Sequence, residues 1–418
     1  MNPAQDILDF LPYGNTLSKV LLYFIGSAII AFILAPFIIN ILYKLRIHRV
    51  AKGDVISQSD YDKGKIGTPI MGGFIVVATV LLITYLFNWE RNFTFLPIGA
   101  LILSSCVGGI DDLLNIFGQA RKQPKPLKLH LKLIRVHKSW SMRIFYFITT
   151  PWAVLKRFFL FLGSKPKSGL QVHEKLIAQA FIGITVGVWV YYKVGWSDVW
   201  IPYISSFDFL TQLINAFPFF MVDEVRSTID IGALMIPFIA VTIMTITNAV
   251  NISDGMDGMA AGLLVNAFLG YTIIAFNLSL PFLNNSTGNE DFRYISYLCA
   301  TTSGALLAYL YFNVKPARVQ MGDFGALGLG TLLSVIAIVL HREFTLLFLC
   351  GVFLFNGIIS RIIQKIWRKA TGKKLFRMIP LHYHFELKGW PEEKVVMRFW
   401  IISAVLTAMG IWLGSLMV

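Results

Sequence analysis

The sequence predicts an all-α integral membrane protein with about ten transmembrane helices. Hydrophobic residues make up 56% of the 418 residues and charged residues only 14%. A water-soluble domain cannot bury so much apolar surface, whereas a run of about 20 apolar residues crosses a bilayer as a helix. Such runs recur along the chain without a long polar block between them, so we expect one polytopic membrane domain over residues 1–418.

Ten apolar runs are long enough to cross a hydrocarbon layer of about 30 Å. They lie near residues 20–43, 70–88, 94–110, 174–192, 230–250, 258–278, 294–313, 325–341, 344–366 and 396–417. The first run lacks the basic start and cleavage site of a removable signal peptide, so we expect it to remain as a helix.

The basic residues predict the orientation of these helices. If the N-terminus is outside, the cytoplasmic links are 44–69, 111–173, 251–257, 314–324 and 367–395, and they contain 27 of the 37 Lys and Arg residues. Basic residues are enriched in cytoplasmic loops, so we expect both termini to be periplasmic. The net charge of +14 follows this topology, and we expect no nucleic-acid partner.

Residues 120–168 form a basic and aromatic insertion in the second of these links. Its stretch 140–162 is apolar enough to suggest an eleventh span, but Pro151 and the pair Lys156-Arg157 interrupt it. An added span would also move the later links to the opposite face. We therefore expect an interfacial amphipathic helix or hairpin on the cytoplasmic leaflet, lying on anionic lipid or a partner protein.

Two of five polar clusters precede this insertion, and all five lie at or beside the predicted cytoplasmic face. Lys65 enters the second helix beside Gly67, Gly72 and Gly73, which suits a phosphate, although for this segment alone a topology-setting Lys with packing glycines is the favoured explanation. The adjacent Asp111 and Asp112 suit Mg²⁺ and phosphate chemistry, with a solvated helix end as the alternative.

The third and fourth clusters flank the sixth and seventh helices. Asn248, Asn251 and Asp254 recur every three residues and would line one side of a helix, with Asp257 following. So many polar groups are rare at a membrane helix end without a partner. Asn313 opens the fourth cluster, which ends at Asp323 just before a helix, where either an anion-related function or a simple N-cap fits.

The fifth cluster contains His382 and His384 in the last cytoplasmic link. Zinc binding lacks convincing further ligands. Contact with a phosphate or nucleotide, or positioning of a metal-bound group, fits this pair better.

In this order, the clusters resemble the polyprenyl-phosphate N-acetylhexosamine-1-phosphate transferase superfamily from about Lys65 to the end of the chain. The shared elements are Lys-x-Gly-Thr-Pro-x-Met-Gly-Gly, Asp-Asp, Asn-x-x-Asn-x-x-Asp-Gly-x-Asp-Gly and Met-Gly-Asp-x-Gly. The histidine segment, residues 385–390 and residues 395–400 resemble the phospho-N-acetylmuramoyl-pentapeptide transferase family of the peptidoglycan branch.

The resemblance implies a Mg²⁺-dependent reaction of UDP-MurNAc-pentapeptide with undecaprenyl phosphate, giving lipid I and UMP in peptidoglycan synthesis. It also implies a multi-pass protein of the bacterial cytoplasmic (inner) membrane with its active site facing the cytoplasm. It suggests a homodimer and contacts with other cell-wall synthesis proteins. The alternatives are a sister enzyme that transfers GlcNAc-1-phosphate or another hexosamine phosphate and, from another class, a membrane transporter.

By the same resemblance, Asp323 is the Mg²⁺ ligand, Asp111 deprotonates or orients the lipid phosphate, and Asp112 supports Asp111 or contacts the metal. The remaining candidates bind the nucleotide or lie beside the phosphates: Lys65, Asn248, Asn251, Asp254, Asp257, Asn313, His382 and His384. The chain departs from the usual pattern at four positions, which are Asn115, Gln320, Ala326 and Tyr383. Tyr383 replaces the middle of three histidines, and Gln320 replaces an aromatic residue suited to stacking on uracil.

Overall fold

The computed structural model describes residues 16–48, 67–89, 94–117, 127–136, 139–148, 150, 169–202, 221–223, 227–280 and 292–416. The chain divides into two compact units, one of Met1–Asp112 with Ala178–Val418 and one of Leu113–Ile177. All candidate site residues belong to the first unit. Lys65 lies outside the described residues, so the prediction for its side chain stays a prediction.

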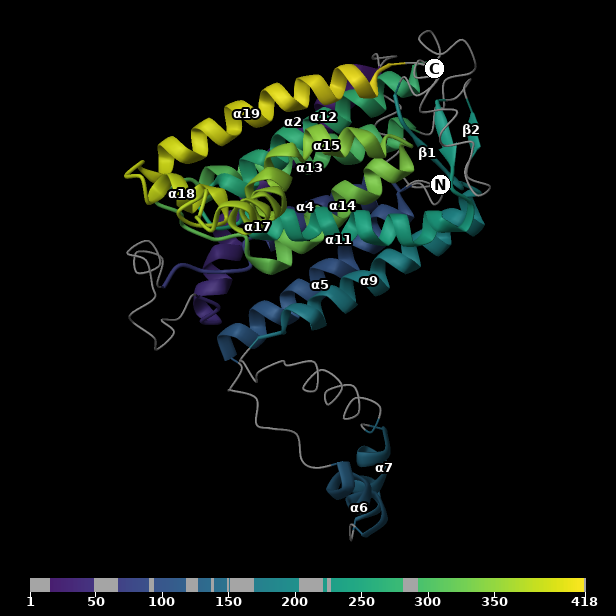
Figure 1. Cartoon of the computed structure of the whole chain (residues 1–418), viewed down its shortest axis with the longest axis vertical. Helices are drawn as coiled ribbons and strands as arrows, with labels where there is room; N and C mark the ends of the chain where they lie inside the picture. The colour runs from purple at the N-terminus through teal and green to yellow at the C-terminus, as the bar shows by residue number, and fades with distance from the viewer. Residues whose placement is uncertain are drawn as a thin grey trace. The chain divides into compact units, whose positions relative to one another are not determined.

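Long apolar helices dominate the described chain (Figure 1). They are α2 (Thr16–Lys44), α4 (Gly73–Phe87), α5 (Phe95–Phe117), α9 (Val172–Trp189), α11 (Met235–Ser253), α12 (Met259–Ser279), α13 (Phe292–Asn313), α14 (Gly322–Val339) and α19 (Glu392–Gly414). The π-helical turn η1 (Val190–Val194) extends α9, and the short η3 (Gly232–Leu234) precedes α11. A helix satisfies its own backbone hydrogen bonds, which is the condition for lying in hydrocarbon.

Three of these helices form the core of the first unit. In the most apolar segments of α12, α13 and α14, 78%, 83% and 83% of the residues are buried, compared with 33% in α2, α9 and α19. Gly304 on α13 lies so close to the Phe24 carbonyl of α2 that no side chain fits between them. Small residues allow this close approach where lipid provides no hydrophobic driving force between helices.

One apolar stretch is broken. The 3₁₀ turn η4 (Glu343–Thr345) and α15 (Leu346–Leu349) are followed after Cys350 by α16 (Gly351–Leu354), the π-helical η5 (Phe355–Ile359) and α17 (Ser360–Thr371). The two halves are bent by 71°. The short helix α18 (Leu381–Glu386) then carries the histidine cluster to the start of α19.

The prediction of a helical, multi-pass membrane protein is confirmed. Within the described ranges, eight helices are long and apolar enough to cross a membrane, or nine if the broken pair forms one span. The helix α4, with 15 residues, is apolar but shorter. Each of the ten predicted runs coincides with one of these helices, while the count of ten crossings stays a prediction.

A small sheet corrects the all-α expectation. The strands β1 (Asp198–Trp200), β2 (Met221–Asp223) and β3 (Thr228–Asp230) form an antiparallel sheet in the order β1-β3-β2. Each strand has three residues, too few for the alternation of polar and apolar residues that would have revealed it in the sequence. This sheet follows η1 and precedes α11, in the link between the fourth and fifth predicted spans.

The second unit contains two short helices within the predicted insertion, α6 (Leu127–Val136) and α7 (Trp140–Ile148). Trp140 and Phe147 of α7 are 75% and 69% exposed. Exposed aromatic residues beside basic ones are typical of an interfacial helix. Residues 120–126 and 151–168 of the insertion lie outside the described residues.

Candidate active site

The first turn of α14 joins two of the predicted acidic positions. The first N–H groups of a helix have no partner within that helix. Here Asp112 of α5 accepts two of them, from Asp323 N–H at 3.2 Å through Oδ1 and from Phe324 N–H at 3.0 Å through Oδ2. Asp112 also lies within the electrostatic influence of Asp323 and, more weakly, Asp111. Asp112 and Asp323 therefore lie next to each other at the positive end of α14, with Asp111 one residue before Asp112 in the chain.

Glycines bring the backbones of three helices together at this point. Gly108 of α5 packs on the carbonyl of Asp323 so closely that a Cβ could not fit. Gly73 of α4 and Gly325 of α14 face each other in the same way. Gly322 has a φ of +72°, a backbone conformation that a side chain rarely adopts, and a Cβ there would lie 2.7 Å from Asp112 Oδ2. The carboxylate positions depend on these contacts.

The segment after Lys65 runs beside the segment before Asp323. Gly72 N–H donates to the Gln320 carbonyl at 2.7 Å, Gly73 N–H to Met321 at 3.0 Å, and Gln320 N–H to Pro69 at 2.9 Å. The first, second and fourth clusters of the sequence therefore meet at one site. Gln320 contributes both of its backbone groups to this pairing.

The loop after α11 is fastened to the same place by side chains. Gly258 N–H donates to Asn313 Oδ1 at 3.1 Å, and Asn313 Nδ2 donates to the Val319 carbonyl at 2.8 Å. Asp257 Oδ2 accepts the Ala317 N–H at 3.1 Å, while the Asp257 N–H donates to Glu392 Oε1 at 2.8 Å. Asp257 and Asn313 therefore shape the loop from within the protein.

Two glutamates at the start of α19 form ion pairs with the segment that follows α13. Lys315 Nζ lies 3.3 Å from Glu392 Oε2 and 3.1 Å from Glu393 Oε1. Desolvation lowers the pKa of Lys315, but the hydrogen bonds to Glu393 and Glu392 outweigh it and raise this pKa above its ordinary value. Sequence reasoning did not include Glu392, because an acidic residue in the first turn of a helix usually needs no further explanation.

The two predicted asparagines of α11 differ in their surroundings. The half-buried Asn248 donates from Nδ2 to Gln179 Oε1 on α9 at 2.6 Å and to the Met244 carbonyl at 2.7 Å. The half-buried Asn251, one turn later, accepts the Asp254 N–H through its backbone carbonyl at 3.1 Å. Asp254 itself is half-buried at the end of the helix. Asn251 and Asp254 are thus placed at the loop that the other clusters surround.

The last cluster reaches this loop through His382. The side chain of His382 is 0% exposed, and a Cβ added at Gly255 would lie 2.6 Å from its Nε2 and 3.2 Å from the Tyr383 hydroxyl. The ring centroids of His382 and Tyr383 are 4.2 Å apart. The departure from the family pattern at Tyr383 therefore lies next to the candidate site.

His384 has a different environment. Its Nδ1 accepts the Arg377 N–H at 3.0 Å, and its ring lies 5.6 Å from Phe376. Burial and the positive charges of Lys388 and Arg377 lower the pKa of His384, which favours its neutral form. This histidine fixes the link before α18, whereas His382 faces the 254–258 loop.

The residues that could hold a metal are the carboxylates at the start of α14. Within the described ranges, no three His, Cys, Asp or Glu side chains form a group that could hold a metal ion. Mg²⁺ is usually held by one or two carboxylates together with water and substrate phosphates. Asp323 and its neighbour Asp112 provide oxygen donors of this hard type, so the donor set fits Mg²⁺ shared with a phosphate substrate.

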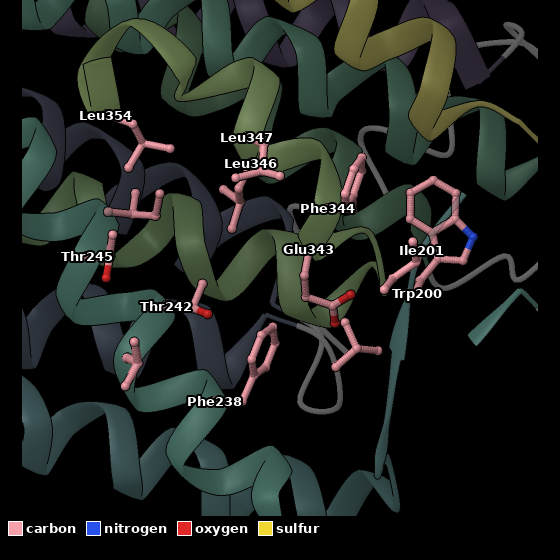
Figure 2. Close-up of a pocket in the computed structure, with 13 residues that line it drawn as sticks. Trp200, Ile201, Phe238, Thr242, Thr245, Glu343, Phe344, Leu346, Leu347 and Leu354 are labelled. Atoms are coloured by element: carbon pink, nitrogen blue, oxygen red, sulfur yellow. The ribbon is translucent and has the colours of Figure 1, made fainter. Parts of the chain in front are cut away.

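A pocket of about 300 Å³ lies near the other end of α14, between β1, α11 and the broken helix (Figure 2). Its lining is almost entirely apolar, with Trp200, Phe238 and Leu347 among the residues, and the carboxylate of Glu343 projects among them. None of the sequence-predicted site residues lines it. We therefore place the candidate active site at the start of α14.

Known proteins resemble the chain over most of its length. Residues 165–341 match the family model described as glycosyl transferase family 4. Three curated relatives carry the name phospho-N-acetylmuramoyl-pentapeptide-transferase. The one from Leptospira biflexa serovar Patoc (strain Patoc 1 / Ames) is 31% identical over 391 residues, covering 91% of this chain and 88% of the relative. That from Acetivibrio thermocellus is 29% identical over 403 residues, 96% of each chain. That from Desulforapulum autotrophicum is 28% identical over 388 residues, 92% of this chain and 89% of the relative.

Proposed function

We infer that this chain, which belongs to the phospho-N-acetylmuramoyl-pentapeptide-transferase family, transfers phospho-MurNAc-pentapeptide from UDP-MurNAc-pentapeptide to undecaprenyl phosphate. The products are lipid I and UMP, and the reaction is a step of peptidoglycan synthesis. The chain is accordingly a phosphoglycosyl transferase and a multi-pass bacterial membrane protein.

One observation carries the choice of site. The two oxygens of Asp112 accept the N–H groups of Asp323 and Phe324, and this contact holds Asp112 and Asp323 together at one helix N-terminus, with Asp111 beside Asp112 in the chain. Phosphate chemistry needs such a place, where carboxylates can share a cation with phosphates beside a positive helix end. Backbone and side-chain hydrogen bonds hold the 67–73 segment and the 254–258 loop beside it, so both substrates would meet a backbone that is fixed at several points.

The mechanism that we propose must offset the negative charges of two phosphate-bearing substrates. An oxygen of the lipid phosphate attacks the phosphorus that carries the sugar, and the bond from that phosphorus to the oxygen of UMP breaks. Mg²⁺ held by Asp323 would supply charge neutralisation for the phosphates. Asp111 orients the lipid phosphate and accepts its proton, while Asp112 holds Asp323 at the helix end.

The remaining candidates divide by position. Lys65 would offset the charge of the diphosphate, and Asn251 and Asp254 would contact the uridine diphosphate portion. The residues Asn248, Asp257 and Asn313 support that loop through their internal hydrogen bonds. His382 faces the loop and would meet the phosphates, with His384 supporting the segment that carries it.

The topology that we propose places this site at the cytoplasmic face of the inner membrane. It has ten crossings, counting α4 and the broken helix, with both termini periplasmic. The distribution of Lys and Arg supports this orientation, because 27 of the 37 lie in the links that would be cytoplasmic. A lipid phosphate can then arrive from the bilayer and a sugar nucleotide from the cytosol.

The insertion 120–168 and the assembly state are separate proposals. We propose that the insertion lies on the cytoplasmic leaflet or on another cell-wall synthesis protein, and that the chain forms a homodimer. Deleting residues 120–168 should reduce activity in membranes or complex formation, and unchanged values for both would contradict the first proposal. The mass of the purified protein in detergent tests the second.

A two-substrate assay tests the reaction. Purified protein with undecaprenyl phosphate and Mg²⁺ should release UMP from UDP-MurNAc-pentapeptide and much less from UDP-GlcNAc, with lipid I formed in equal amount. Preference for UDP-GlcNAc would identify a sister transferase. Transport of the nucleotide without UMP release would identify a transporter. Omitting Mg²⁺, or adding a chelator, should abolish UMP release.

A further inference from the structure

Asn356 is a buried polar residue in an otherwise apolar part of the broken helix. It lies in the π-helical turn η5, and its side chain is 0% exposed. Single π-helical turns inside α-helices are frequent at functional sites, because the extra residue turns a side chain toward a place that the regular helix would miss. Here the turn directs Asn356 between the end of α11 and the start of α18.

The hydrogen bonds of Asn356 fix which way its amide points. Its Oδ1 accepts the backbone N–H of His382 at 3.1 Å, and its Nδ2 donates to Ser253 Oγ at 2.9 Å. If the amide were rotated by half a turn, its NH₂ group would face a backbone N–H, and two donors cannot bond. The carbonyl oxygen of Asn356 therefore faces His382.

This orientation determines the tautomer of His382. Its Nδ1 lies 3.1 Å from the same Oδ1. An amide oxygen can only accept, so His382 Nδ1 must carry the hydrogen. In the neutral ring, Nε2 is then the nitrogen with the lone pair. A Cβ added at Gly255 would lie 2.6 Å from this Nε2, which means that Nε2 faces the 254–258 loop across a residue without a side chain.

We propose that Asn356 is a positioning residue for the transfer reaction, which holds His382 as the Nδ1–H tautomer with Nε2 directed at the loop of Asp254. The inference rests on the proposed function only for its kinetic consequence. Asn356 also links the start of α18 to the end of α11, because its other hydrogen bond goes to Ser253, the residue before Asp254. One side chain thus fixes the ring's tautomer, its direction and its distance from the loop.

The first experiment tests the tautomer without the reaction. Histidine-selective ¹⁵N labelling of the full chain in detergent, with the His382 signals assigned by their loss in His382→Gln, distinguishes a protonated Nδ1 from a protonated Nε2. We expect Nδ1–H in the unmodified chain and a mixture of tautomers in Asn356→Leu. A protonated Nε2 in the unmodified chain at neutral charge would overturn the proposal.

The second experiment separates positioning from a structural role. Asn356→Leu should lower kcat by about 10- to 100-fold, the loss typical when the hydrogen-bond partner of a functional histidine is removed, with little change in KM. In the His382→Gln background the same substitution should have an effect of less than about twofold, because the two residues act as a unit. Equal losses in both backgrounds would overturn the proposal.

Two further variants control for folding and for charge. Ser360→Ala removes a buried hydrogen bond of 2.8 Å to the backbone carbonyl of Asn356 but leaves its amide in place, so activity should stay near normal. Asn356→Asp keeps an acceptor for Nδ1 and adds a negative charge, which should move the pH limb that depends on His382 upward by about one unit. If the unmodified chain releases no UMP, the proposed function fails, while the ¹⁵N signals still decide the role of Asn356.

Discussion

At the start of α14, both oxygens of Asp112 accept backbone N–H groups, whereas just beyond its end neither oxygen of Glu343 has a hydrogen bond of standard geometry to a described residue. Both side chains are buried, at 6% and 5% exposure. The helix itself accounts for the contrast, because free N–H groups exist at its first turn and free carbonyl groups at its last. Burial of a carboxylate alone therefore does not indicate a site, whereas burial at a helix N-terminus with other carboxylates does.

The end of α14 satisfies its carbonyl groups without a ligand. His341, with a φ of +55°, donates its N–H to Ile338, and Arg342 donates its N–H to Ala337. This is the Schellman arrangement. The Arg342 side chain is committed as well, to the Gly414 and His341 carbonyls and to the Trp200 ring at 4.4 Å. Among the described residues, no cation is directly paired with Glu343. The carboxylate at the start of α14 therefore has hydrogen-bond donors from the helix, whereas the one beyond its end has none.

Asp323→Asn should cause the largest effect at the start of α14. We expect UMP release to fall at least about 10³-fold, because a metal contact contributes several kcal/mol to the transition state. The thermal midpoint in detergent should stay unchanged, since the Asp323 N–H to Asp112 is retained. Asp223→Asn on β2 is the matched control and should be fully active. Turnover near normal in Asp323→Asn would end the metal assignment.

Asp112→Asn should separate the structural part of this arrangement from the chemical part. An amide has one oxygen to offer to two backbone N–H groups, so we expect a loss of about 1 kcal/mol in unfolding free energy, the scale of a lost helix cap. Activity should fall about 10²-fold as Asp323 moves with the helix end. A large loss of activity with no loss of stability would instead make Asp112 a direct participant, and thermal unfolding followed in parallel with UMP release distinguishes these outcomes.

Gly108→Ala should disturb the same contact from α5. The added Cβ collides with the Asp323 carbonyl, so α5 and α14 must separate, at a cost of about 1 to 3 kcal/mol. Activity should fall as well, because displacement of the carboxylates by a fraction of an ångström misaligns them. Gly99→Ala on the same helix is the control, since its Cβ meets nothing within 4 Å. Equal behaviour of the two variants would show that the close packing is unimportant.

The sequence predicts the membrane class, the positions of the helices and the clusters that meet at the start of α14. Motifs such as Asp111-Asp112 and Asp323 are visible because carboxylates are rare within membrane helices. Asn356 and Glu392 were missed for a physical reason. Asn356 is a single polar residue whose partner His382 lies 26 positions away. Glu392 stands beside Glu393 at a helix start, and its partner Asp257 lies 135 positions away, so no local spacing reveals either contact. The three-residue strands escaped for lack of length.

Glu343→Gln tests the other side of the comparison. Because Glu343 lies outside the proposed site, we expect UMP release within about twofold of normal. The unfolding free energy should rise by about 1 kcal/mol, since an amide is less costly to bury than a carboxylate that has no directly paired cation among the described residues. Thermal unfolding and the UMP assay check the two expectations. Loss of activity beyond about tenfold would mean that the two ends of α14 are coupled.

The smallest effect should come from the pair of His341 and Asp198, which lies beyond the end of α14. His341 Nε2 lies 2.8 Å from the Asp198 carbonyl and 3.5 Å from its Oδ1, with both side chains mostly buried. The hydrogen bond to His341 lowers the pKa of Asp198. Burial alone would lower the pKa of His341, but the Asp198 contacts and the nearby Glu343 carboxylate outweigh it and raise this pKa. The contribution of His341 is therefore complete below its unfolded pKa and is lost as pH rises through the folded one, while that of Asp198 is lost on acidification. The unfolding free energy of the unmodified chain should exceed that of His341→Gln by up to roughly 1 kcal/mol between about pH 5 and 6, and by less at pH 9. A difference that grows toward pH 9 would contradict this pairing.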